Sequence, residues 1–218
     1  MKHRALLILL ALVPTGQVLA GDALLDEALA RSGQPMGAVS GFIVNTNTLI
    51  GGAQPEIERE TFDLTKKPDE AYGSYDQLKD VIGPDAKRVA TNDGRMLYRF
   101  RTHRVPDGKA TPKGVKIDKD DDIEFDGTAE IVRDAQQRPY VSQIQLHMRS
   151  ATGPLIGRLK TMDLAFGYAP SADGTVVDAV NAWADVKVRA LFFIHREFTL
   201  DSRWSPTAVA IVNAHVAE

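Results

Sequence analysis

The sequence predicts a mainly β protein, in which an antiparallel meander forms a curved sheet or half-barrel and a short helix lies at its N-terminal end. The first observation is that apolar and polar residues alternate with a period of two over about 123–131, 140–148 and 155–168. The second is that short polar turns separate these segments. The alternation predicts one apolar and one polar face, as in an antiparallel sheet covered on one side.

The first segment of the chain predicts export. Residues 1–20 combine a positive start at Lys2 and Arg4, an apolar stretch, and the small-residue end Val18-Leu19-Ala20. The apolar stretch is shorter than the roughly 20 residues that cross a bilayer. We therefore expect a signal peptide at 1–20, a single β-rich domain at 21–218, and no transmembrane anchor in the mature chain.

Composition narrows the classes of partner. The chain has no cysteine, so disulfides, thiolate metal ligands and a lipid-bearing N-terminal cysteine are excluded. Removal of residues 1–20 changes the formal charge from −3 to −5, because Lys2 and Arg4 are lost. A mildly acidic domain is a poor electrostatic match for nucleic acid or an anionic lipid surface. We expect a soluble periplasmic protein, with secretion as the alternative and no nucleic-acid partner.

The first half of the domain predicts short elements. Leucine and alanine at helical spacing, after the potential N-cap Asp22, predict a helix at about 23–31. Residues 34–55 fit either a strand or irregular structure, and 57–64 fit one strand. A second short helix is expected over 75–82.

The second half predicts a meander. Asn92-Asp93-Gly94 predicts a tight turn in a hairpin that ends near residue 105, followed by a polar surface loop over 106–114. The alternation places Tyr140 on the same face as Ile144, Leu146 and Met148. Residues 175–203 read as one last long strand with a break near Asn181, and 205–216 fit either a helix or a strand.

The apolar face supplies the candidate ligand-binding residues. A curved sheet must cover this face, and incomplete cover by short helices would leave room for an apolar ligand. The candidates share the inward parity of the predicted strands: Met96, Tyr98, Phe100, Ile144, Leu146, Met148 and Phe192.

Metal and catalytic signals are incomplete. Asp118, Asp120 and Asp122 alternate as at the start of a calcium loop, but Ile123 stands at the position that needs glycine and Ala129 at the position that needs glutamate. The histidines lack metal-ligand spacing, and no nucleophile motif, P-loop or dinucleotide fingerprint occurs. We therefore expect no cofactor and favour a non-catalytic role, while an enzyme stays open.

One stretch resembles a known family. Phe125-Asp126-Gly127-Thr128-Ala129-Glu130-Ile131, with Asp134 and its turn, is similar to the recurring hairpin of the LolA/LolB lipoprotein carriers and their relatives. The resemblance is one of architecture and extends mainly over 123–204. It implies a periplasmic half-barrel that shelters acyl chains under a helical lid.

Three functions follow as hypotheses. The first is a non-catalytic carrier or binding domain for an apolar or lipid-like ligand. The second is an interaction or scaffold domain that presents a sheet edge or apolar patch to an envelope protein. The third is a metal-dependent hydrolase, which requires at least two of His103, His147, His195 and the acidic residues to meet in one cleft.

Overall fold

Nine strands form one antiparallel sheet in the part of the chain that the computed structural model describes. That part comprises residues 22–35, 38–52, 54–89, 95–108, 112–113, 115, 122–153, 157–190 and 194–208. The strands in chain order are β1 (Phe42–Ile50), β2 (Glu56–Asp63), β3 (Lys87–Val89), β4 (Met96–Thr102), β5 (Phe125–Arg133), β6 (Pro139–Met148), β7 (Gly157–Pro170), β8 (Val177–Ala190) and β9 (Ile194–Ser205). The order across the sheet is β2-β1-β9-β8-β7-β6-β5-β4-β3, which confirms the predicted antiparallel meander.

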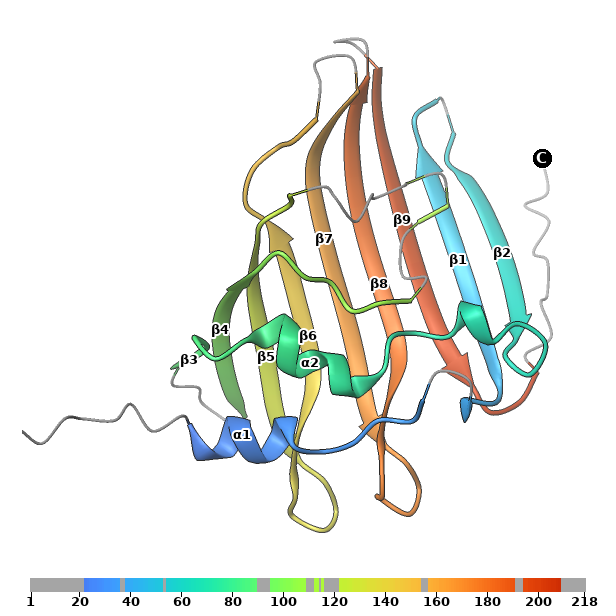
Figure 1. Ribbon diagram of the computed structural model, residues 1–218. Helices are drawn as coiled ribbons and strands as arrows, with labels where there is room; N and C mark the ends of the chain where they lie inside the picture. Colours follow the sequence, from blue (N-terminus) through green and yellow to red (C-terminus); the bar gives the residue numbers. More distant parts are fainter. Residues whose placement is uncertain are drawn as a thin grey trace, which may run out of the picture.

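The sheet is covered on one face. Figure 1 shows α1 (Ala23–Leu29), α2 (Leu78–Ile82) and their connecting segments crossing the same face. We call this the covered face and the opposite one the outer face. Side chains of the covered face and its cover form the apolar core, as the one-sided alternation predicts.

Both short helices begin and end near the predicted positions. Asp22 caps α1 by accepting a hydrogen bond from the backbone N–H of Leu24 at 3.1 Å. The predicted second helix comprises a 3₁₀ turn over Tyr75–Gln77 followed by α2. These helices are too short to be stable alone, so their order depends on packing against the sheet.

Tyr75 joins three parts of the core. Its hydroxyl donates to the carbonyl oxygen of Ala28 in α1 at 3.0 Å and accepts from the N–H of Val141 in β6 at 2.8 Å. Its ring meets that of Tyr168 in β7 edge to face, with centroids 5.5 Å apart. Burial raises the pKa values of both tyrosines, so both stay neutral at physiological pH.

The start of β6 corrects the predicted parity. Ile131 pairs with Val141 and Glu130 with Gln143, which leaves Ser142 as an extra residue on β6. This β-bulge reverses the side-chain alternation, so Val141 is fully buried while Tyr140 is only half-buried. The prediction that Tyr140 shares the inward face of Ile144 is therefore wrong.

The predicted last strand is in fact two strands. β8 ends at Ala190 and β9 begins at Ile194, and the two pair antiparallel from Ala190↔Ile194 onward. The intervening sequence, Leu191-Phe192-Phe193, contains no glycine, proline or asparagine to predict a turn. At the predicted break, Asn181 instead lies within β8, where the shift in register opposite Gly167 and Tyr168 makes a second bulge.

Within the described residues, 34–55 contains one of its two expected alternatives, a strand, whereas 106–114 differs from a simple surface loop. Residues 34–55 contain β1, which pairs with β9 on one side and β2 on the other. Within 106–114, Pro106 and Pro112 are buried, and Gly108 forms a β-bridge with Tyr72. The described part of the loop thus contributes to the cover, because its two prolines are buried and Gly108 is bridged to the core residue Tyr72. Residues 1–20, the 92–94 turn and the C-terminal 209–216 lie outside the described residues.

Candidate functional site

Most of the predicted ligand-binding residues are part of the packed core. Tyr98, Phe100, Ile144, Leu146 and Met148 are buried, with at most 6% of any of them exposed. Phe192 lies outside the described residues. Burial, assisted by the nearby Asp22 carboxylate, raises the pKa of Tyr98 to about 12. These side chains hold the cover against the sheet, and only Met96 among the described candidates is half-exposed.

Met96 lines a hollow at the end of the sheet where α1 begins. The hollow has a volume of about 560 Å³, within the range of small-molecule sites. We call it the arginine hollow. Its lining residues come from α1, β3, the start of β4 and the end of β5: Leu24, Arg88, Arg95, Met96, Ile131, Val132 and Arg133.

The strand register brings the lining together. Met96 pairs with Ile131, and Arg88 pairs with Tyr98 one pleat further along β4. Side chains two residues apart on a strand share a face, so Arg88 and Met96 meet on the covered side. One guanidinium nitrogen of Arg88 lies 2.9 Å from the Met96 sulfur.

Two of the three guanidinium groups form long ion pairs, and the third has no carboxylate partner among the described residues. The Arg88–Asp22 ion pair spans 3.9 Å, and the Arg95–Glu130 pair spans 3.5 Å. Arg133 donates one hydrogen bond to the carbonyl oxygen of Gln137. Each guanidinium carries five N–H donors, and exposed pairs of this length are weak. The hollow therefore combines apolar walls with cationic donors that a ligand can reach.

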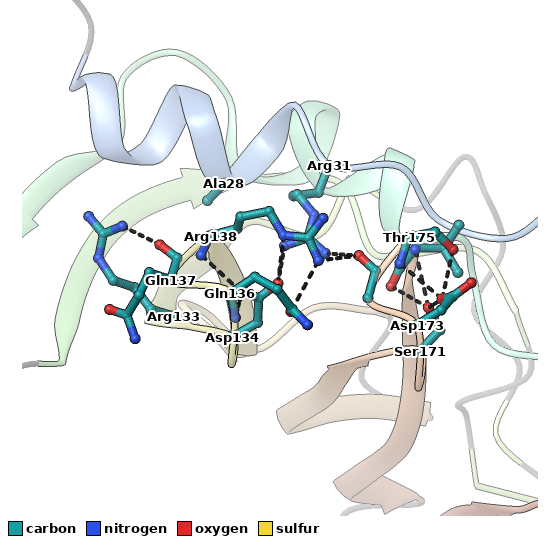
Figure 2. Close-up of polar contacts among 12 residues, drawn as sticks. Ala28, Arg31, Arg133, Asp134, Gln136, Gln137, Arg138, Ser171, Asp173 and Thr175 are labelled. Atoms are coloured by element: carbon teal, nitrogen blue, oxygen red, sulfur yellow. Dashed lines mark hydrogen bonds and ion pairs between the residues drawn. The ribbon is translucent and has the colours of Figure 1, made fainter.

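A partly buried polar network positions α1 beside the hollow. Figure 2 shows Arg31, just after α1, directed at Asp134 in the β5–β6 turn. Arg31 donates to the Asp134 carboxylate at 3.0 Å and to the Gly174 carbonyl oxygen in the β7–β8 turn at 2.9 Å. Arg138 donates to both acceptors as well, at 3.1 and 2.6 Å. One helix end is thereby fixed to two hairpin turns.

The charge state of Asp134 follows from these contacts. Burial is the largest single influence and opposes ionisation. Hydrogen bonds from the backbone N–H of Arg138, from Arg31 and from the N–H of Gln136 outweigh it together. The pKa of Asp134 therefore lies below its usual value, and the carboxylate stays ionised at neutral pH. Sequence reasoning singled out Asp134 only as a turn residue, because nothing local predicts its contact with Arg31.

The predicted metal and catalytic residues form separate pairs. Asp118 and Asp120 lie outside the described residues, whereas Asp122 is exposed and lies 2.7 Å from the Nδ1 atom of His103. His147 contacts Asp163 on the outer face. Within the described ranges, no three histidine, aspartate or glutamate side chains form a group that could hold a metal ion. The His147–Asp163 pair meets the minimum that the hydrolase hypothesis requires, but no third side chain joins it to form a metal site within the described residues.

The sheet edge at β2 bears on the scaffold hypothesis. Its exposed residues include Glu56, Glu58 and the large apolar Ile57, which is 64% exposed. Lys113 lies over this edge, with its ammonium group 2.6 Å from Glu58. Charged residues on an edge strand oppose pairing with a strand of another protein. The charges on β2 therefore disfavour strand addition at this edge.

Comparison with protein-family models, with curated proteins and with solved structures gives no match. Among the described helices, none is long and apolar enough to cross a membrane.

Proposed function

We propose that this protein is an exported, non-catalytic binding domain of the periplasm that holds an amphiphilic ligand with an anionic headgroup. The observation that carries the proposal is the arginine hollow, which is lined by Arg88, Arg95 and Arg133 together with apolar residues. The predicted export signal at 1–20 and the resemblance to lipoprotein carriers agree with it.

The chemistry of the lining favours a carboxylate or phosphate headgroup. Guanidinium groups bind such anions through paired, charge-assisted hydrogen bonds. Three guanidinium groups face two nearby carboxylates, Asp22 and Glu130, so the hollow keeps a net positive charge. Leu24, Met96 and Ile131 offer an apolar surface for the first part of an acyl chain.

A titration of the purified protein tests this proposal. Dodecanoate and dodecyl phosphate are the anionic probes, and dodecanol is the uncharged probe with the same chain length. We expect Arg88→Gln and Arg95→Gln each to weaken dodecanoate binding about tenfold, since each removes a charge-assisted hydrogen bond. Isothermal titration calorimetry measures the affinity of each variant and of the unchanged protein for each probe.

Arg99→Gln is the matched control, because Arg99 is exposed on β4, close to Arg95 in the sequence, but lies outside the hollow. Its affinity for dodecanoate should equal that of the unchanged protein. Equal affinity for dodecanol and dodecanoate, or no effect of either hollow variant, would contradict the proposal. Native mass spectrometry of protein purified from its own envelope then identifies the ligand that it carries.

A further inference from the structure

A second hollow lies on the outer face, away from the core. It has a volume of about 520 Å³. We call it the outer groove. Its lining comes from the four neighbouring strands β5 to β8: Asp126, Thr128, Gln143, Gln145, Leu146, His147, Asp163, Leu164, Ala165, Asn181 and Trp183.

The register explains why the sheet surface is hollowed here. Ala165 on β7 pairs with Gln145 on one side and with Trp183 on the other. A methyl group thus stands between two much larger side chains, and the groove follows β7. One pleat along, a Cβ on Gly167 would lie 2.5 Å from the side-chain oxygen of Asn181. The glycine therefore leaves the space in which the Asn181 amide lies.

Trp183 is a large aromatic residue that is exposed on the surface of the sheet. The side chain is 42% exposed and lies among mainly polar residues of the outer groove. Trp204, the other tryptophan, donates its indole N–H to the Ser40 carbonyl oxygen at 2.8 Å, whereas the indole N–H of Trp183 has no partner among the described residues. A flat apolar ring and a free donor are therefore presented together to solvent.

The amide groups around the indole are also available. Gln143, Gln145 and Asn181 make no side-chain hydrogen bond within the described part of the chain. Each amide provides two donor hydrogens and an acceptor oxygen. Three such groups beside an exposed ring suit a ligand that carries many hydroxyl groups around an apolar ring face.

The charged groups of the outer groove are compensated within the protein. His147 contacts Asp163, and Asp126 lies 3.4 Å from both Arg101 and Arg149. A charged ligand would have to compete with these pairs. The uncompensated groups are neutral donors and acceptors, which favours an uncharged ligand.

We infer that the outer groove binds an uncharged oligosaccharide. One pyranose ring packs on the indole of Trp183, and its hydroxyl groups exchange hydrogen bonds with Gln143, Gln145 and Asn181. This site is on the opposite face from the core and shares no residue with the arginine hollow. The inference therefore does not depend on the proposed lipid function.

Isothermal titration calorimetry of the purified protein with maltotetraose, cellotetraose and N-acetylchitotetraose tests the inference. We expect saturable binding of at least one of these sugars. Trp183→Ala should weaken that binding at least tenfold, and Gln145→Ala should weaken it several-fold. Trp183→Phe keeps an aromatic face and should retain part of the affinity.

Two control variants remove the same residue types elsewhere. Trp204→Phe and Gln54→Ala lie outside the outer groove and should leave the sugar affinity unchanged. Arg95→Gln should also leave it unchanged, which separates this site from the arginine hollow. Absence of binding to all three sugars at about 10 mM, or binding that survives Trp183→Ala, would overturn the inference. Circular dichroism confirms that each variant is folded, which is expected because Trp183 is an exposed residue.

Discussion

At the scale of single residues, the pairing of Phe100 with Gly127 shows how one small residue shapes the core. The two residues stand opposite each other on β4 and β5. A Cβ on Gly127 would lie 2.3 Å from the nearest ring atom of Phe100, so the phenyl ring covers the glycine backbone. Phe100 was predicted to bind a ligand, but its ring is instead needed to fill the core above Gly127.

Gly127→Ala should therefore destabilise the protein by about 1–3 kcal/mol, since extra volume in a packed core forces side chains out of their preferred rotamers. For a domain of this size, that loss lowers the melting temperature by about 2–12 °C. Differential scanning calorimetry measures the change.

The double variant Phe100→Leu with Gly127→Ala is the control for this mechanism. The shorter leucine relieves the contact with the new methyl group, so the double variant should lose less stability than the sum of the two single variants. Strict additivity would show that the ring contact is not the cause.

At the scale of elements, the C-terminal end of α1 is fixed to the sheet by the contacts of Arg31. The helix spans Ala23–Leu29 and buries only Leu25 and Ala28. Such a short helix is marginal in water, so its position depends on this packing, on the Tyr75–Ala28 hydrogen bond and on the network of Arg31 with Asp134 and Gly174. Because Leu24 lines the arginine hollow, this network also sets one wall of the proposed ligand site.

Arg31→Gln should release α1 while leaving the β5–β6 turn intact. Arg138 and two backbone N–H groups still bind Asp134 in that variant. We expect faster hydrogen–deuterium exchange over 23–29, unchanged exchange over 134–138, and a melting temperature lower by several degrees. Mass spectrometry of exchanged peptides measures the first two quantities.

Arg99→Gln, which removes an exposed arginine from β4, should change none of these quantities. Equal acceleration of exchange in α1 and in the turn would instead indicate that the whole end of the sheet depends on Arg31.

At the scale of the whole molecule, acidic turns make stability sensitive to low pH. Hydrogen bonds from Ser171 and from the backbone and side chain of Thr175 lower the pKa of Asp173 to about 2. The pKa values of Asp63 and Asp134 are lowered as well, whereas burial raises that of Asp178. Three aspartates with a lowered pKa favour folding at neutral pH, and one aspartate with a raised pKa acts in the opposite direction.

A carboxyl group with a lowered pKa stabilises the folded state above the pKa of the unfolded chain and loses that contribution as the pH falls through the folded pKa. The melting temperature should therefore be nearly constant above about pH 5 and fall between about pH 4 and pH 2. Asp173→Asn should make this fall shallower. Thermal unfolding followed by circular dichroism at a series of pH values measures it.

Asp85→Asn is the matched control, because Asp85 is exposed and makes no hydrogen bond within the described residues. Its pH profile should parallel that of the unchanged protein. A melting temperature that rises from pH 4 to pH 2 would mean that raised groups such as Asp178 dominate.

Local patterns predicted much of the architecture. Period-two alternation placed β5, β7 and most of β6 correctly, because a sheet with one buried face forces alternate residues inward. Capping and turn residues placed α1 and the turn at 134. The bulge at Ser142 and the division of the last segment into β8 and β9 were missed, since neither has a local sequence signal.

The candidate site was predicted less well, for a physical reason. The alternation along a strand identifies which side chains face inward. It does not distinguish a packed core from a cavity, because that depends on how completely the covering segments fill the space above the sheet. Met96 lines a hollow, while Phe100 and Ile144 are buried in the core. Trp183 and the amides of the outer groove were missed, because polar outward positions are ordinary in a one-sided sheet.

The sequence by itself determined the fold class, the short helices and the inward face of most strands, because these follow from side-chain period and local hydrogen bonding. Only the tertiary structure decided the pairing of β1 with β9, the contact of Arg31 with Asp134, and the meeting of Arg88, Arg95 and Arg133 around one hollow. Arg31 and Asp134 are 103 positions apart in the chain. Such contacts form when strands that are distant in the sequence pair in the sheet. No local sequence pattern specifies which distant segments pair.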